Sequence, residues 1–129
     1  MMALRTIHTP ATTHPHGHYS QAVVHNDTVY VSGVLGNSED RHVGAERSIE
    51  DQAANCFDQL RIILEAASSD MSHVLKLNVF VARIDLWPRV NTICESVFGG
   101  HRPARIVVPC DEMRLGSLIE MDAVAAVID

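Results

Sequence analysis

The chain has 129 residues, of which 47% are hydrophobic and 20% charged, and its formal net charge is −6 at pH 7. This length predicts a single domain, residues 1–129, that can bury a core without a metal or a disulfide framework. There is one lysine, Lys76, and the nine arginines are scattered, so the sequence lacks the basic patch that nucleic-acid binding requires. A small acidic ligand held by one or two arginines is compatible with this charge pattern.

The sequence shows no signal for a membrane or for export. It contains no run of roughly 18 apolar residues, and its first residues lack the apolar run and cleavage site of a signal peptide. The three cysteines, Cys56, Cys94 and Cys110, are widely spaced and form no CxxC motif. We therefore expect a cytoplasmic protein with no membrane contact, in which cysteines serve as small buried apolar side chains.

The N-terminal third of the chain predicts three strands. The segment "ALRTIHT" (3–9) is the first, and "SQAVVHNDTVYVSG" (20–33) predicts two more, joined by a hairpin turn at His25-Asn26-Asp27. The polar residues 34–47 are rich in turn formers, and we expect them to form a loop.

A long amphipathic helix is expected next. Ser48 is a typical N-cap, and Asp51 three residues later makes an imperfect capping box. The apolar residues that follow are spaced as on one helix face: Ala53, Phe57, Leu60, Leu64 and Ala67.

A strand and a second helix are predicted after it. "HVLKLNVFVARI" (73–84) alternates, with an apolar side made of Leu75, Leu77, Val79 and Val81. Asp85 is expected to cap the second helix, with Pro88 in its first turn and Gly99-Gly100 at its end. Its expected buried stripe is Leu86, Val90, Ile93 and Val97.

Two last strands, residues 104–110 and 117–129, flank the turn "DEMRLG" and are expected to form a hairpin. The predicted fold class is α+β, with one mixed sheet of about six strands and both helices on one face. Several apolar residues of the last two strands are assigned to the uncovered face: Val107, Ile119, Met121 and Ala123. An exposed apolar sheet face predicts a homo-oligomer.

Two charged residues interrupt these apolar strands. Arg105 begins one strand, and Glu120 lies within the other, with Asp122 on the same face. One interpretation is an exposed cross-strand ion pair, which would contribute little to stability. The other is a functional pair, in which the guanidinium binds a substrate carboxylate and the carboxylate moves protons.

Four segments together resemble the Rid family of reactive intermediate deaminases, also called YjgF-type proteins. They are "GHYSQAVVHNDTVYVSG", "EDQAANCFDQLRIILEAA", "HRPARIVVPC" and "LIEMDAVAAV", which run over nearly the whole chain in the family's order and spacing. The resemblance implies a chorismate-mutase-like fold and a homotrimer with active sites in the clefts between subunits. It also implies hydrolysis of enamines and imines, such as 2-aminoacrylate, to a 2-keto acid and ammonia, without a metal or an organic cofactor.

The resemblance also assigns roles to single residues. Arg105 would bind the substrate carboxylate, and Glu120 would hold and polarise the attacking water. Tyr19 would pack against the substrate, Ser32 and Gly33 would line the pocket with their backbone, and Asn91 would be a polar pocket residue. Asp122 matches a second acid that we interpret as structural.

The sequence departs from the family pattern at the predicted pocket. His18 replaces a common proline, Val34-Leu35-Gly36 replaces a typical Gln-Leu-Pro, and Ile106-Val107 replaces small or polar residues, with Val107 at the position of a thiol. We therefore expect His18 at the mouth of the cleft and a more apolar pocket wall. A bulkier imino acid or an aminomuconate-like compound is an alternative substrate, and a non-catalytic ligand-binding or regulatory protein is an alternative function. The ribonuclease or translation-inhibitor activity of some relatives is disfavoured by the acidic charge.

The alternating histidines His14, His16 and His18 are compatible in spacing with a zinc site on a strand. Pro15 and Gly17 make a regular strand improbable there, and no carboxylate or cysteine lies nearby in the sequence. We therefore predict no metal site and assign the segment to the lip of the active site, with Gly17 allowing the turn that delivers Tyr19.

Overall fold

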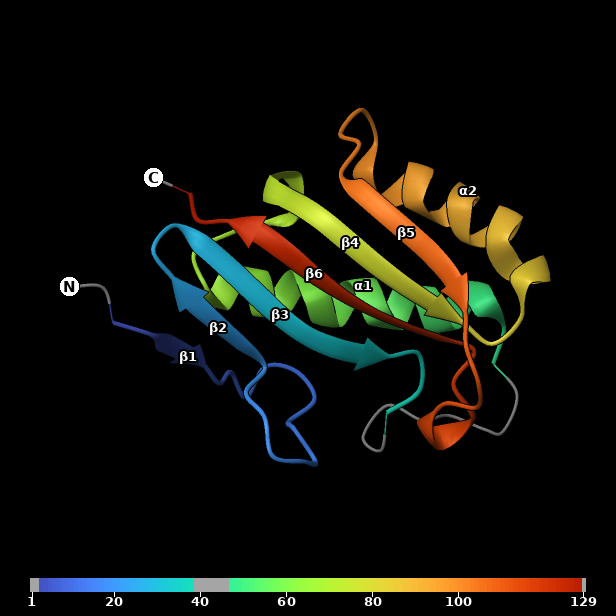
Figure 1. Ribbon diagram of the computed structural model, residues 1–129, viewed down its shortest axis with the longest axis horizontal. Coiled ribbons are helices and arrows are strands. Elements are labelled where there is room, and N and C mark those ends of the chain that lie inside the picture. Colours follow the sequence, from blue (N-terminus) through green and yellow to red (C-terminus); the bar gives the residue numbers. More distant parts are fainter. Residues whose placement is uncertain (1–2, 39–46, 129) are drawn as a thin grey trace.

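The computed structural model describes residues 3–38 and 47–128. These residues form one sheet of six strands covered on one face by two helices, as the sequence predicts (Figure 1). The expected loop over residues 34–47 lies partly outside the described residues. None of the helices in the described ranges has the length and apolar character needed to span a membrane.

The sheet has the order β1-β2-β3-β6-β4-β5. Its strands are β1 (Arg5–Ile7), β2 (Ala22–His25), β3 (Thr28–Leu35), β4 (Val74–Val81), β5 (Ala104–Pro109) and β6 (Ile119–Ala126). All neighbours are antiparallel except β4 and β5, which are parallel. The hairpin between β2 and β3 turns at Asn26, which has a φ of 56°, a left-handed conformation that asparagine tolerates well.

The predicted hairpin of the last two strands is wrong. Strand β4 lies between β5 and β6 and pairs with both of them (Figure 1). The connection through the 3₁₀ turn η3 (Arg114–Gly116) therefore crosses over β4. The parallel pairing of β4 with β5 is possible because helix α2 (Trp87–Phe98) makes the crossover between them.

Helix α1 (Ile49–Ala66) begins and packs as predicted. The Ser48 hydroxyl accepts a hydrogen bond from the Asp51 backbone N–H at 3.0 Å. The five apolar residues of its predicted face are all buried, and the helix runs behind β3 and β6 (Figure 1). Burial of this face against the sheet makes the main core.

Helix α2 differs from its prediction in two details. A 3₁₀ turn, η2 (Ile84–Leu86), precedes it, and Asp85 makes no capping hydrogen bond. The buried residues of α2 are Val90 and Cys94, preceded by the buried Leu86 of η2, whereas Val97 is exposed. The helix ends at Gly99, as predicted, with a φ of 61°, a positive value that favours glycine.

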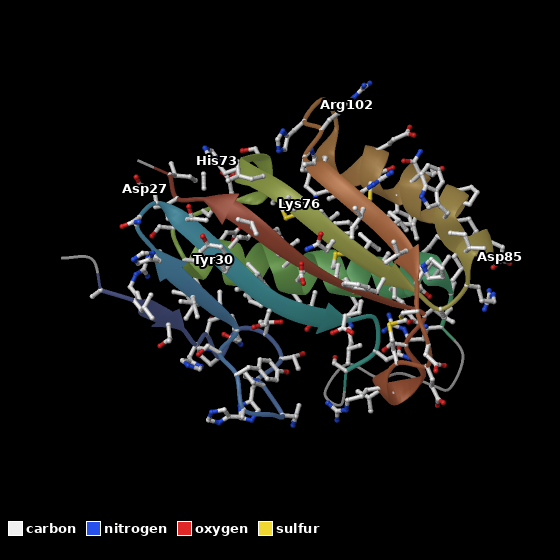
Figure 2. All side chains as sticks on the ribbon, in the orientation of Figure 1. Asp27, Tyr30, His73, Lys76, Asp85 and Arg102 are labelled. Atoms are coloured by element: carbon white, nitrogen blue, oxygen red, sulfur yellow. The ribbon has the colours of Figure 1, made fainter. Side chains whose placement is uncertain are left out.

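The prediction that apolar side chains of the last two strands lie on the uncovered face is wrong. Ile119, Met121 and Ala123 are buried under the helices, and Val107 packs partly buried against the same core. A register shift between Val74 and Lys76 has a related effect in β4, because it buries Val74 and leaves Leu75 exposed. The uncovered face instead carries a mixed set that includes Tyr30, Lys76 and Phe80, and Figure 2 shows Tyr30 and Lys76 on it.

Candidate active site

The first half of the site surrounds Glu120 on the uncovered face of the sheet. The neighbours of Glu120 in β6, Ile119 and Met121, point into the core, so the alternation of the strand turns Glu120 away from the helices. Its half-buried carboxylate lines a cavity of about 380 Å³. Tyr19, Ser32 and Gly33 line the same cavity, so the structure brings together four of the residues predicted from the sequence.

An irregularity in β3 shapes this cavity. The pairing of β3 with β6 shifts between Val31 and Val34, so Ser32 and Gly33 lie outside the regular ladder. Ser32 instead bonds back to the preceding loop, because its hydroxyl donates to the Ser20 carbonyl at 2.6 Å and its N–H donates to Gln21. Bulges of this kind re-aim the chain beside functional sites.

Gly33 is required by a close approach and not by its backbone angles. A Cβ at this position would overlap the Glu120 carboxylate. The missing side chain therefore leaves the room in which the carboxylate lies.

Tyr19 reaches the cavity from the loop before β2. Its N–H donates to the Gly17 carbonyl at 3.1 Å, and a Cβ at Gly17 would approach the tyrosine ring to 3.1 Å. Tyr19 is 51% exposed, so it forms a wall of the cavity that also contacts solvent.

His18 does not line this cavity. Its side chain is exposed, and the histidines that do line the cavity are His14 and His16, whose rings meet edge to face at 5.3 Å. The predicted contact between His18 and substrate stays a prediction. No group of three or more potential metal ligands occurs among the described residues.

Two effects act on the Glu120 carboxyl. Burial raises its pKa above the ordinary 4.5, and the negative charge of Asp122 raises it further. Asp122 accepts a hydrogen bond from the Asn78 amide at 2.7 Å, a contact between β6 and β4 that agrees with the structural role predicted for it. Glu120 thus holds a proton more readily than an exposed glutamate does.

The second half of the site surrounds Arg105 on the helix-covered side. Arg105 pairs in register with the buried Leu77 of β4, so its side chain extends toward α2. Its Nη1 donates to Asn91 Oδ1 at 3.0 Å, which brings together another two of the predicted residues. Both line a hollow of about 750 Å³ between α2 and the start of β5.

The charge of Arg105 is not balanced by a carboxylate. Among the described residues, its partners are Asn91, the Cys94 thiol and the Trp87 ring, whose centroid lies 5.4 Å from Cζ. All three are neutral groups. A half-buried guanidinium with neutral partners is suited to bind an anion from solution.

Val107 lies on the same face of β5 as Arg105, two residues further along. It is half-buried and packs against the core, and it lines neither hollow. Its expected contact with substrate stays a prediction.

Arg105 and Glu120 belong to opposite faces of the sheet. Their strands are separated by β4, so the cross-strand ion pair considered from the sequence does not form. The candidate site of one chain therefore consists of two separate halves.

Sequence reasoning missed Trp87 and Cys94. They lie four residues before and three residues after Asn91, a spacing that places all three on one face of α2. The signal available in the sequence is this spacing around Asn91, the one of the three residues that the family resemblance identifies.

Comparison with known proteins gives a consistent set of similarities. The family model described as endoribonuclease L-PSP matches residues 9–127. A 2-iminobutanoate/2-iminopropanoate deaminase of Dermatophagoides farinae is 31% identical over 127 residues, which cover 98% of this chain and 99% of that protein. A rat protein of the same name is 35% identical over 109 residues, covering 84% of this chain and 80% of the relative. A solved yeast structure superposes with a TM-score of 0.91 at 29% identity, over 98% of this chain and all of the other.

Proposed function

Because the chain belongs to the endoribonuclease L-PSP family, which includes the Rid (YjgF-type) proteins, we propose that it is an imine deaminase. Its substrates are 2-imino acids and their enamine tautomers, such as 2-aminoacrylate, and its products are a 2-keto acid and ammonia. The observation that carries this proposal is the guanidinium of Arg105, which is held in place by neutral partners. The deaminase names of relatives that match along most of the chain support it.

Arg105 binds the substrate carboxylate in this proposal. A guanidinium presents five N–H donors in a plane and binds a carboxylate through two parallel hydrogen bonds. Since Asn91 engages one nitrogen, donors of the guanidinium remain for the substrate.

Glu120 orients the attacking water and transfers protons in this proposal. The imine carbon is electrophilic, so hydrolysis requires an oriented water, a base and a proton route to nitrogen. The carboxylate takes one proton from the water as the water oxygen bonds to carbon and passes it to the nitrogen, which gives a carbinolamine. It then carries the hydroxyl proton to the amino group, so that ammonia leaves as the C–N bond breaks and the C=O bond of the 2-keto acid forms. A raised pKa suits a group that must both take and give a proton. This chemistry needs neither a redox group nor a cofactor.

The complete site is formed by two copies of the chain in a homotrimer. A small imino acid has to contact Arg105 and Glu120 at once, and these residues lie on opposite sides of one sheet. A neighbouring copy that brings its Glu120 half against the Arg105 half satisfies this requirement. Tyr19 and the Ser32-Gly33 backbone then form the wall beside Glu120, while Asn91 supports Arg105.

A second candidate is a deaminase specific for a bulkier imino acid, including an aminomuconate-like compound. The cavity of about 380 Å³ beside Glu120 lies within the roughly 300–1,000 Å³ typical of pockets for drug-sized ligands. A three-carbon imino acid leaves much of that space empty. A rise in kcat/KM with side-chain length, measured on imines from several amino acids, would favour this candidate over a general deaminase.

The proposed function is tested by trapping imines. An amino-acid oxidase releases 2-imino acids in the presence of semicarbazide, and the rate of semicarbazone formation is measured with and without the protein. The wild type should suppress the semicarbazone, whereas Arg105→Ala and Glu120→Gln should not. Arg83→Ala is a matched control, because Arg83 is exposed and pairs with Asp85 outside the site. Equal behaviour of wild type and Arg105→Ala over several amino acids would overturn the proposal.

We also place the protein in a reducing compartment such as the cytoplasm. All three cysteines are free, and two of them are buried. Burial raises the pKa of the Cys56 thiol, which donates a hydrogen bond to the Val34 carbonyl, as expected of a structural cysteine.

A further inference from the structure

Three consecutive turns of α2 hold the guanidinium of Arg105. Trp87, Asn91 and Cys94 are spaced by four and three residues and therefore lie on one helix face. The Trp87 ring centroid is 5.4 Å from Cζ of Arg105, and Asn91 Oδ1 accepts from Nη1 at 3.0 Å. Burial raises the pKa of the Cys94 thiol, and the same guanidinium acts on this thiol in the opposite direction, with a smaller effect.

The orientation of the Asn91 amide is itself fixed. Its Nδ2 donates to Glu95 Oε1 at 3.1 Å while its Oδ1 accepts from Arg105. Glutamate only accepts and arginine only donates, so a flipped amide would lose both hydrogen bonds. Asn91 therefore fixes one nitrogen of the guanidinium but leaves the group free to rotate about that contact.

Trp87 supplies the second constraint. A cation within about 6 Å of a tryptophan centroid is attracted to the ring face, and 5.4 Å satisfies this condition. One point of attachment at Asn91 and contact with the Trp87 ring together define the position of the guanidinium. A substrate carboxylate can then bind only to those N–H groups of the guanidinium that Asn91 and Trp87 leave accessible.

The position of Trp87 is hard to explain by core packing. This residue, the first of α2, is 38% exposed, whereas its neighbour Leu86 is 2% exposed. The buried side of this segment is made by Leu86, Val90 and Cys94. The contact with Arg105 is thus the specific interaction that the structure gives the Trp87 ring.

We propose that Trp87 is a positioning residue, which holds the guanidinium of Arg105 in the orientation that binds the substrate carboxylate. This inference rests on the carboxylate-binding role of Arg105 in the proposed function. It identifies a specificity element for 2-imino acids, because the ring and Asn91 together select the direction from which the carboxylate approaches.

The test compares two substitutions at Trp87 in the intact protein. Trp87→Phe keeps an aromatic face, and Trp87→Leu keeps apolar bulk without one. Cation–π contacts of about 0.5–2 kcal/mol correspond to roughly 2- to 30-fold in binding. Trp87→Leu should raise both the KM for the imino acid and the Kd for 2-oxobutanoate by about tenfold with little change in kcat, while Trp87→Phe should stay within about threefold of the wild type.

A spectroscopic readout is available because Trp87 is the only tryptophan of the chain. Titration of the wild type with 2-oxobutanoate should change the tryptophan emission in a saturable way. N-acetyltryptophanamide corrects for absorption by the keto acid. Arg105→Ala should abolish the saturable change.

Controls separate this inference from the proposed function. Val97→Ala alters an exposed residue on the same helix and should leave KM unchanged, and urea unfolding shows whether each variant is folded. If Arg105→Ala retains full activity, the proposed function itself fails. If Arg105→Ala is inactive while folded Trp87→Leu matches the wild type in KM and in Kd measured by calorimetry, only the role of Trp87 is overturned.

Discussion

Arg105 and Glu120 lie on opposite faces of the sheet, with β4 between their strands. In the sequence they are fifteen residues apart, in segments that look like the two arms of a hairpin. The crossover through α2 places β5 on the far side of β4, and strand alternation turns the two side chains in opposite directions. A site that uses both residues therefore has to be shared between copies of the chain.

A shared site predicts complementation between inactive variants. Arg105→Ala and Glu120→Gln chains are unfolded together and refolded to mix the two variants. In the proposed homotrimer a site is intact if one neighbour supplies Arg105 and the other Glu120. Random mixing in equal amounts makes about one quarter of the interfaces intact, so about a quarter of wild-type activity should return. Arg105→Ala mixed with the double variant is the control and should stay inactive. Lack of recovery in trimers shown to be mixed would place the whole site in one chain.

Two glycines of β3 and the turn after it should respond differently to alanine. At Gly33 the new Cβ meets the end of the Glu120 side chain, which can move. Gly33→Ala should therefore fold normally, but kcat should fall about 10- to 100-fold because the carboxylate is displaced.

Gly36→Ala is the matched comparison. There the new Cβ would approach Cβ of the buried Gln52 at 2.7 Å and Ile119 at 3.0 Å, atoms anchored in α1 and β6. Overpacking of this kind costs about 1–3 kcal/mol of unfolding free energy, to be measured by urea denaturation. A stable Gly36→Ala protein, or an unstable Gly33→Ala protein, would contradict this account of the two positions.

The raised pKa of Glu120 predicts a pH-dependent effect on stability. Burial and Asp122 raise this pKa above 4.5, so the folded protein binds more protons than the unfolded chain just above that pH. Its free energy of unfolding therefore falls as the pH rises from about 4.5 through the folded pKa. Glu120→Gln does not titrate and should be more stable than the wild type near pH 7, by less than about 1 kcal/mol because the carboxylate is half exposed.

The measurement is urea unfolding of both proteins at about pH 4 and pH 7. The protomer concentration is held constant, because the stability of the proposed homotrimer depends on it. The difference should shrink toward the lower pH. If the free energy of unfolding of the wild type instead rises relative to that of Glu120→Gln as the pH rises, the pKa of Glu120 is lowered, contrary to the effect of burial.

The N-cap of α1 gives a prediction that does not involve the site. Ser48→Ala removes the acceptor of the Asp51 N–H and should lower the unfolding free energy by about 1 kcal/mol. Imine hydrolysis at a temperature below the transition should be unchanged. Ser96→Ala, at an exposed serine within α2, is the control and should not lower stability, because alanine has the higher helix propensity.

The sequence by itself determined those features that depend on neighbouring residues. Ser48 with Asp51, the apolar face from Ala53 to Ala67, Asn26 in its hairpin and Gly99 after α2 are local signals, and each lies where it was expected. The family pattern added the residues around Glu120 and around Arg105, because the resemblance identifies positions by spacing and needs no coordinates.

Only the tertiary structure decided which face each strand presents and which strands are neighbours. Alternation shows that Ile119 and Met121 share a side but not that this side is the core, and it does not place β4 between β5 and β6. Those facts depend on the crossover of α2 and on the shift at Val74, which bring together parts of the chain distant in sequence. The contacts of Arg105 with its neutral partners, Trp87 among them, also join separate parts of the chain. They could be identified only from the packing of α2 against β5.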